Sequence, residues 1–272
     1  MKNPFAGLLR KTPEILGLDI GSSAVKAIQL KPSGRSYRLT ALGVAPLGPD
    51  AIVDGTIKNA PAVVEAIRRA VPRGESRGRD AVLAVCGREL IIKKVQIPHV
   101  DRDELAGAVE LEAEHHIPFA IDEVFLDYHD VGERDGMMDL ILVAVKKTKV
   151  NEYAAVVEEA GLVPAVVDVD SFALGNQFEV NFPDDSREAV ALIDIGASIM
   201  KTNVVRGGST IFARDIPFGG NNYTQAISQQ LRIPFEQAES AFDGEGADAH
   251  GARQDATAWG SAPTGSIRPP DR

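Results

Sequence analysis

Two short segments of this chain carry the same chemically useful residues at the same spacing. The first reads LGLDIGSSAVKAIQL over residues 16–30, and the second reads ALIDIGASIMKTNVV over residues 191–205. The residues that coincide in one register are Asp19 with Asp194, Ile20 with Ile195, Gly21 with Gly196, Ser23 with Ser198 and Lys26 with Lys201. Each segment predicts a strand, a tight glycine turn and a second strand, so the chain contains an internal repeat of one hairpin.

The repeated hairpin has the residue types that a phosphate site needs. A glycine in the turn reaches positive φ and leaves no side chain in the way of a ligand. Backbone N–H groups and a serine hydroxyl can then face phosphate oxygens, and the aspartate can hold Mg²⁺ directly or through water. A single Asp-Ile-Gly turn needs its glycine for geometry alone, whereas two copies in matching contexts favour a polyphosphate held from both sides.

The two hairpins define the candidate nucleotide site. Its predicted phosphate-binding residues are Asp19, Gly21, Ser22, Ser23 and Lys26 in the first hairpin and Asp194, Gly196, Ala197, Ser198 and Lys201 in the second. Asp19 and Asp194 are also the predicted Mg²⁺ ligands. Gly219, Gly220 and Asn221 precede a predicted helix, and they either offer N–H groups to an anion or form a simple helix entry with an Asn cap.

Hydrophobic periodicity predicts the elements that position these residues. The predicted strands are residues 15–20, 24–30, 37–46, 81–85, 90–97, 124–128, 140–145, 163–169, 189–195, 199–205 and 209–216. The predicted helices are residues 61–70, 101–114, 148–160, 171–178, 221–231 and one that starts near Pro234. The strand at 163–169 is expected to be buried. Lys146, Lys147 and Lys149 are expected to form a solvated face at a helix start, with contact to an acidic partner as the alternative.

Composition and charge exclude several classes of function. Of the 272 residues 44% are hydrophobic, which is enough for a buried core, and the formal net charge is −10. Such an acidic chain lacks the basic surface that nucleic acids or an anionic membrane require. The sequence contains no run of about 18 apolar residues, the length that a membrane-spanning helix needs. The single cysteine, Cys86, lies in the apolar run AVLAVCG and is interpreted as a small core residue, which fits a reducing cytoplasm.

The two hairpins resemble the phosphate-1 and phosphate-2 motifs of the superfamily of actin, sugar kinases and heat-shock chaperones. Gly17–Lys26 matches the first motif and Ile193–Lys201 the second. The resemblance implies an α/β fold, the actin-like (ribonuclease H-like) ATPase fold, in which two lobes close on ATP and Mg²⁺. A connecting helix in that fold carries an acidic or amide residue. This implies that Asp170 in VDVDSFALGN positions the catalytic water or the metal, with Asp168 as the alternative.

A finer resemblance is to the PilM family of type IV pilus assembly and to its cell-division relative FtsA. It rests on KKVQIPHV, EAEHHIPFAIDEVFLDY, VDVDSFALGN and RDIPFGGNNYTQAI, and with the first hairpin it spans most of residues 15–240. It implies a cytoplasmic ATP-binding scaffold of pilus biogenesis and twitching motility that reaches the inner membrane only through partners. The implied partners are the cytoplasmic N-terminal segment of a PilN-type membrane protein, held in a groove beside an extra subdomain, PilO, and the pilus motor ATPases.

The resemblance also implies a domain organisation with an FtsA-type 1C subdomain inserted between the two phosphate motifs. The expected units are residues 1–79 as the first part of lobe 1 (subdomain 1A), 80–165 as the inserted subdomain 1C, 166–187 as the end of 1A with the connecting helix, 188–242 as part of lobe 2 (2A) and 243–272 as a tail. The tail has no helical or strand period, which indicates either a natural flexible end or a change of reading frame.

The chain departs from the family pattern near its end, where the Gly-rich motif that contacts adenosine has no match. An incomplete second lobe would expose apolar strand faces and unpaired edges. We therefore expect lowered solubility, self-association and weak or no ATP binding. Catalysis would be at most a weak Mg²⁺-dependent ATP hydrolysis.

Other functions and sites were weighed against this interpretation. A sugar or acetate kinase on the same fold would need a catalytic aspartate and a substrate pocket, for which there is no clear signature. An FtsA-like division scaffold would need a C-terminal amphipathic membrane helix, which the tail lacks. His115 and His116 could suggest a metal site, but adjacent histidines on a helix point apart and no third ligand is spaced suitably. The resemblance to the PilM family implies that this region is a docking or domain-packing surface.

Overall fold

The computed structural model describes residues 15–34, 36–72, 79–182 and 188–242. Its strands are β1 (Leu16–Ile20), β2 (Ala24–Ser33), β3 (Ser36–Pro46), β4 (Ile52–Val53), β5 (Thr56–Ile57), β6 (Asp80–Val85), β7 (Leu90–Pro98), β8 (Val124–Arg134), β9 (Met137–Lys146), β10 (Val163–Val169), β11 (Val190–Ile195), β12 (Met200–Arg206) and β13 (Ser209–Ile216). Its helices are α1 (Ala60–Ala70), α2 (Arg102–His116), α3 (Lys147–Glu159), α4 (Asp170–Asn181), α5 (Gly220–Leu231) and α6 (Phe235–Phe242), with one 3-10 turn, η1 (Ile121–Glu123).

Every predicted helix and strand is present, although β8 extends well past its predicted end and the short hairpin β4–β5 was not predicted. No described helix is long and apolar enough to cross a membrane.

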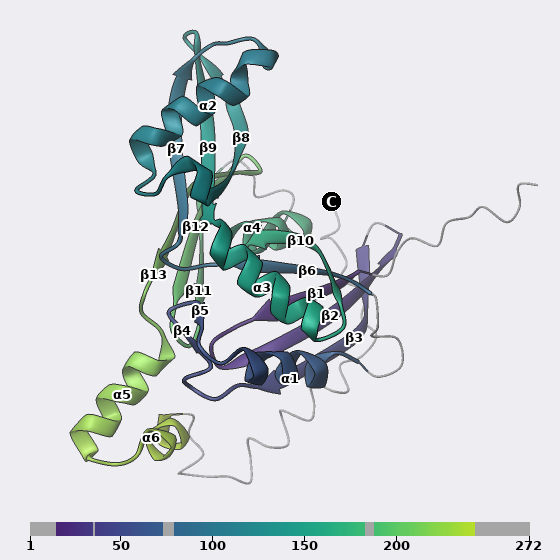
Figure 1. The fold of residues 1–272 in the computed structure, drawn as a ribbon, viewed down its shortest axis with the longest axis vertical. Helices are drawn as coiled ribbons and strands as arrows, with labels where there is room; N and C mark the ends of the chain where they lie inside the picture. Colours follow the sequence, from purple (N-terminus) through teal and green to yellow (C-terminus); the bar gives the residue numbers. More distant parts are fainter. Residues whose placement is uncertain (1–14, 35, 73–78, 183–187, 243–272) are drawn as a thin grey trace, which may run out of the picture.

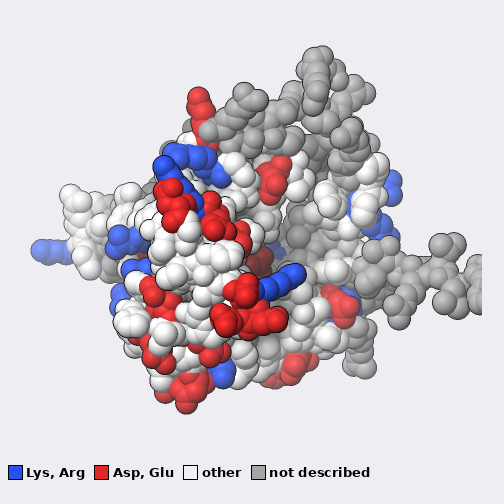
Figure 2. Space-filling view, turned by 90° about the horizontal axis from the view of Figure 1, so that it is seen from above, with Lys and Arg blue, Asp and Glu red and all other residues white. Residues whose placement is uncertain are grey.

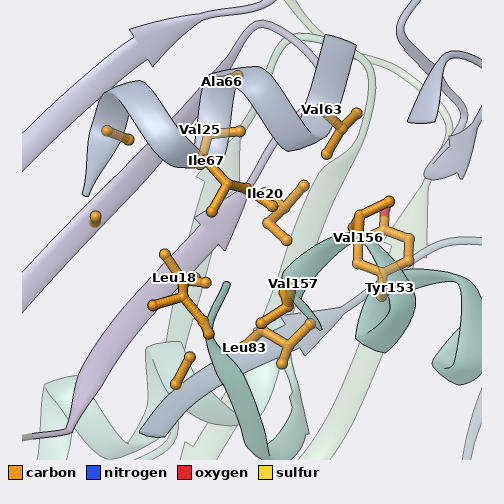
Figure 3. Packing of buried hydrophobic residues seen from close by; sticks show 14 of the residues in the cluster. Leu18, Ile20, Val25, Val63, Ala66, Ile67, Leu83, Tyr153, Val156 and Val157 are labelled. Carbon is orange, nitrogen blue, oxygen red and sulfur yellow. The ribbon is translucent and has the colours of Figure 1, made fainter. Parts of the chain in front are cut away.

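A five-stranded sheet forms the centre of the first lobe (Figure 1). Its order is β10-β6-β1-β2-β3, with β10, β6 and β1 parallel and with β2 antiparallel to both β1 and β3. Helices α1 and α3 cover one face, because alternate residues of the strands are apolar and point to that side. Figure 3 shows Leu18, Ile67 and Val157 converging in this core from a strand and two helices.

The opposite face of β2 and β3 is apolar and exposed. Ile28, Leu42 and Val44 lie there with much of their surface accessible, and Ile193 and Ile195 on β11 are exposed in the same way. Apolar strand faces are therefore exposed, as expected, while an incomplete second lobe as their cause, self-association and lowered solubility stay predictions.

Strand β10 is an edge strand, and the prediction that it is buried is wrong. Among the described strands it pairs only with β6, and Val163 and Val166 are exposed. A short apolar run is compatible with a central or an edge strand, and only the order of the strands decides between them.

A three-stranded sheet with the order β7-β9-β8 is inserted between β6 and α3 (Figure 1). Helix α2 covers one face of this inserted sheet, where Val95, Leu105 and Leu140 belong to a second apolar core. Figure 2 views this end of the molecule, over which carboxylates are spread beside smaller groups of Lys and Arg. The predicted bounds 80–165 include β6 and β10, which pair within the first sheet, so we propose the narrower bounds 90–146 for the inserted subdomain.

The second lobe is built on the antiparallel sheet β11-β12-β13, followed by α5 and α6. Helix α4 contacts β6 and β10 of the first lobe as well as β12 and β13 of the second. The connecting helix therefore joins the two sheets, and its first residue, Asp170, lies at the junction.

Candidate functional site

The first predicted hairpin joins β1 to β2. Asp19 lies opposite Lys26 in the strand register, and Lys26 Nζ donates to Asp19 Oδ2 at 2.8 Å. The Gly21 N–H closes the turn by donating to the Ala24 carbonyl at 3.1 Å. Both charged side chains are about half exposed, at 55% for Lys26 and 50% for Asp19, so a ligand can reach them.

The second hairpin joins β11 to β12 and repeats this geometry. Asp194 lies opposite Lys201, whose Nζ donates to Asp194 Oδ2 at 3.0 Å. The Gly196 N–H donates to the Ile199 carbonyl at 3.1 Å, as Gly21 does to Ala24. The internal repeat in the sequence is therefore a repeat in the structure. No hydrogen bond or ion pair between described residues joins the two hairpins directly.

Lys201 differs from Lys26 because it contacts a second carboxylate. Its Nζ lies 3.0 Å from Oδ2 of Asp170 at the start of α4, and its side chain is only 14% exposed. Burial opposes its charge, but the carboxylates of Asp170 and Asp194 outweigh burial and hold the pKa of Lys201 above its ordinary value. The ammonium group thus links the connecting helix to the second hairpin.

The two candidate acidic residues of the connecting segment lie in different places. Asp170 pairs with Lys201 of the second hairpin, whereas Asp168 lines a groove beside the inserted sheet. Asp168 Oδ1 accepts a hydrogen bond from the Val169 N–H at 2.7 Å. The geometry favours Asp170, and its role toward a water or metal stays a prediction.

The start of α5 packs directly on the second hairpin. The Gly220 N–H donates to the Gly196 carbonyl at 3.0 Å, and the Asn221 N–H donates to the Ala197 carbonyl at 2.8 Å. The Asn221 amide also reaches Ser198 Oγ at 3.5 Å. These two N–H groups are engaged by the hairpin and do not face an anion, contrary to one of the two interpretations of the sequence.

Asp215 is part of the junction between the lobes and was missed from the sequence. It lies opposite Lys201 in the β12–β13 register, and its Oδ2 accepts the Gly87 N–H at 2.6 Å. Gly87 follows β6 and leads into the inserted sheet. The neighbouring Cys86 is half-buried, and burial together with the Asp170 carboxylate raises the pKa of its thiol. A strand pairing diagram could have placed Asp215 beside Lys201, but no pattern in the sequence indicated Gly87.

Replacing Asp215 by asparagine should change how stability depends on pH. Burial raises the pKa of this carboxyl above its ordinary value of 3.8, opposed by the Gly87 N–H, while Asp170 raises it further and Lys201 and Lys149 lower it. The folded state then binds the proton more tightly than the unfolded state, so wild-type stability falls as pH rises from about 4 through the folded-state pKa.

Calorimetric melts between pH 4 and 7.5 check this prediction. We expect Asp215→Asn to melt like the wild type near pH 4, where both side chains are neutral, and at a higher temperature at pH 7. A wild type that is the more stable form at pH 7 would show that Lys201 stabilises the ionised carboxylate more than burial destabilises it.

Lys149 is buried, and the predicted solvated lysine face is wrong at this position. Its side chain is 2% exposed, and Nζ donates to the Gly55 carbonyl at 2.6 Å, with the nearest carboxylate oxygen, on Glu89, 3.9 Å away. The Tyr153 hydroxyl donates to the same carbonyl at 2.9 Å. These two donors hold the unpredicted β4–β5 turn close to Gly87, where an added Cβ would lie 3.0 Å from the Asp54 carbonyl oxygen.

No metal site is formed by the paired histidines. His115 Nδ1 contacts the Leu111 carbonyl and His116 Nε2 contacts Glu112, both contacts lying within α2. The described residues contain no group of three or more His, Cys, Asp or Glu that could hold a metal ion. A Mg²⁺ ion at Asp19 or Asp194 would therefore depend on phosphate oxygens and water for most of its ligands.

A groove of about 970 Å³, called here the first groove, lies between the inserted sheet, α4 and the turn between β12 and β13. Its apolar wall includes Phe125, Val143, Val167, Phe172 and Phe178. The carboxylates on its lining are Asp127, Asp168, Glu179 and Glu188, against one arginine, Arg206. Apolar walls with carboxylates beside them suit an extended peptide that carries aliphatic and basic side chains.

The chain is similar to bacterial proteins of cell division. Cell division protein FtsA of Bacillus subtilis (strain 168) is 28% identical over 254 residues, which cover 82% of this chain and 56% of that protein. FtsA of Escherichia coli (strain K12) is 23% identical over 253 residues, which cover 83% of this chain and 59% of that protein. The chain thus spans less than two thirds of the length of these curated relatives.

The fold is similar to that of a protein of pilus assembly. A chain of the PilM-PilN type IV pilus biogenesis complex superposes with a TM-score of 0.74 at 27% identity, over 85% of this chain and 69% of that chain. This likeness confirms the predicted actin-like ATPase fold with its inserted subdomain. The family model of the type IV pilus assembly protein PilM matches residues 17–246, from the first hairpin through the inserted sheet to α6. The chain therefore belongs to the PilM family of type IV pilus assembly proteins.

Proposed function

We propose that this chain is an adaptor of type IV pilus assembly that binds the cytoplasmic N-terminal segment of a PilN-type membrane protein in the first groove. The observation that carries the proposal is the groove itself, about 970 Å³ of largely apolar space between α4 and the inserted sheet. The likeness to the chain of a PilM-PilN complex supports the class of partner. On this proposal the protein acts in the cytoplasm and reaches the inner membrane, PilO and the motor ATPases through that partner.

The chemistry of the first groove suits a short segment with aliphatic and basic residues. Phe125 on β8 is 47% exposed and presents an aromatic ring at the groove without being part of a core. Asp127 lies two residues further along the same strand and is exposed. An aromatic anchor beside a carboxylate recognises an apolar side chain next to an arginine or lysine.

A nucleotide would bind at the two hairpins, which have half-exposed aspartates and glycine turns in matching geometry. On this proposal Lys26 and Lys201 would contact phosphate oxygens, and Asp19 and Asp194 would hold Mg²⁺ through water. The ion would neutralise the phosphate charge when bound. Asp170 would orient a water for hydrolysis of the nucleotide. We expect this hydrolysis to be slow and to shift the lobes between two states.

A peptide titration tests the proposal. Fluorescence anisotropy of a labelled peptide, matching the cytoplasmic start of the PilN-type protein from the same genome, should show saturable binding. Phe125→Glu should weaken binding at least about thirtyfold, because it removes the aromatic anchor and places a hydrated carboxylate where the apolar side chain of the peptide would pack. Leu111→Glu on the exposed side of α2 is the matched control, since Leu111 is apolar, 64% exposed and outside the groove lining.

The outcomes separate the proposed roles. Binding that ignores Phe125→Glu would place the peptide elsewhere, and no binding by the wild type would count against the adaptor role and leave an FtsA-like or kinase-like role open. Repeating the titration with Mg-ATP present measures whether the hairpins and the groove are coupled.

A further inference from the structure

A second groove lies on the same inserted sheet, on the other side of β13. It has a volume of about 630 Å³ and is lined by the β6–β7 turn, by Leu90–Lys94 of β7 and by Ile211–Asp215 of β13. Ile141 of β9 lines both grooves, and Thr210 at the start of β13 lines the first one. Strand β13 therefore divides the face of the inserted sheet that α2 leaves uncovered into two separate grooves.

The two grooves have opposite charge. The first is lined by four carboxylates and one arginine, as described above, whereas the second is lined by Arg88, Lys93, Lys94 and Arg214 against Asp54 and Asp215. A positive groove stands out on a chain whose formal net charge is −10.

Part of this positive charge is not neutralised within the described chain. Lys94 Nζ pairs with Asp139 at 2.8 Å, Arg88 lies 3.8 Å from Asp54, and Asp215 accepts the Gly87 N–H. Lys93 and Arg214 are exposed and make no ion pair with another described residue. They remain available to carboxylates of a binding partner.

The strands on both sides of the second groove are edge strands. β7 is an outer strand of the sheet β7-β9-β8, and β13 is an outer strand of β11-β12-β13. Each has one edge whose backbone N–H and C=O groups pair with no described strand, and such an edge can accept an added strand. Ile92, Ile199 and Phe212 supply apolar surface between these edges.

We propose that the second groove binds an extended segment of another protein in which acidic residues alternate with aliphatic ones, added as a strand beside β7 or β13. The alternation follows from strand geometry, because successive side chains of a strand point to opposite sides. Those on one side of the added strand would contact the apolar surface of the groove, and those on the other side would contact Lys93 and Arg214. The lined stretch of β13, Ile211–Asp215, sets the length at about five or six residues. This site is separate from the first groove and does not depend on the function proposed for it.

Defined peptides test the proposal on the full chain. The probe is a fluorescein-labelled octapeptide in which Glu and Asp alternate with Val and Leu, and anisotropy measures its affinity. We expect saturable binding that the double variant Lys93→Glu/Arg214→Glu weakens at least about tenfold. Arg206→Glu, an exposed arginine of the first groove, is the matched control and should change affinity less than twofold.

Further peptides distinguish recognition from adhesion. Three altered octapeptides should each lose binding. The first has Lys in place of the acidic residues, the second has the acidic and aliphatic residues in two separate blocks, and the third is N-methylated at alternate backbone amides. The PilN-type peptide should bind at the same time as the acidic one, because β13 separates the grooves.

Several results would overturn the proposal. These are no binding of the acidic peptide, equal binding of the Lys peptide, or binding that the double variant leaves unchanged. A dimer of the chain that the double variant dissociates would assign the groove to a second copy instead. Circular-dichroism melts of the variants confirm folding, since both substituted side chains are exposed.

Discussion

Replacing Lys201 by methionine lowers the free energy of unfolding by about 2–3 kcal/mol, because it removes the only cation that contacts Asp170 and Asp194 among the described residues. Methionine keeps most of the side-chain volume, so the loss measures the charge and its hydrogen bonds. The full cost of leaving a buried charge unpaired is about 3–5 kcal/mol, and it is reduced here because Asp194 is 47% exposed. For a chain of this size the melting temperature should fall by roughly 5–10 °C.

The internal repeat supplies the control for this measurement. Lys26→Met removes the equivalent lysine in the first hairpin, whose pair with Asp19 is about half exposed and contacts no second carboxylate in the described part of the chain. Exposed pairs contribute about 0–1 kcal/mol, so this variant should melt within about 3 °C of the wild type. Combining Lys201→Met with Asp170→Asn should recover part of the lost stability. Equal losses for the two lysine variants would contradict a bridging role for Lys201.

Lys201 contacts a second described carboxylate and Lys26 does not, and this difference could not be predicted from the sequence. The repeat predicted both Asp–Lys hairpins, because a strand, a glycine turn and a facing strand are encoded within a few neighbouring residues. The contact between Lys201 and Asp170 depends on how α4 packs on β12, which no local pattern describes. The same holds for Asp215 and Gly87, which are 128 residues apart in the chain.

The elements were predictable from periodicity, and their surroundings were not. An amphipathic pattern located α1 and its buried side correctly, since helical spacing alone decides which residues share a face. The run at β10 was assigned to the interior because an edge strand and a central strand can have the same composition. Lys149 follows two half-buried lysines, Lys146 and Lys147, and only the carbonyl of a distant turn explains its full burial.

Gly219→Ala should separate α5 from the second hairpin and destabilise the protein by about 2–4 kcal/mol. The added Cβ would lie 2.4 Å from the Gly196 carbonyl oxygen and 2.6 Å from that of Ala197, and neither backbone atom can rotate away. Relief requires the helix to move, which lengthens the hydrogen bonds from Gly220 and Asn221 to the hairpin. Hydrogen exchange at these two amides should accelerate together with the fall in melting temperature.

The effect on ligands then separates the hairpin's structural role from its proposed role. If α5 supports a phosphate-binding turn, Gly219→Ala reduces any Mg-ATP-dependent rise in melting temperature and leaves binding of the PilN-type peptide within about twofold, because the first groove does not include α5. Gly107→Ala on α2 is the matched control, since its added Cβ meets nothing within 4 Å and alanine favours a helix by about 1 kcal/mol. That variant should melt slightly higher than the wild type. If Gly219→Ala melts at the same temperature as Gly107→Ala, the contact between α5 and the second hairpin is loose enough to admit a side chain. In that case α5 gives the hairpin no rigid support for binding a phosphate.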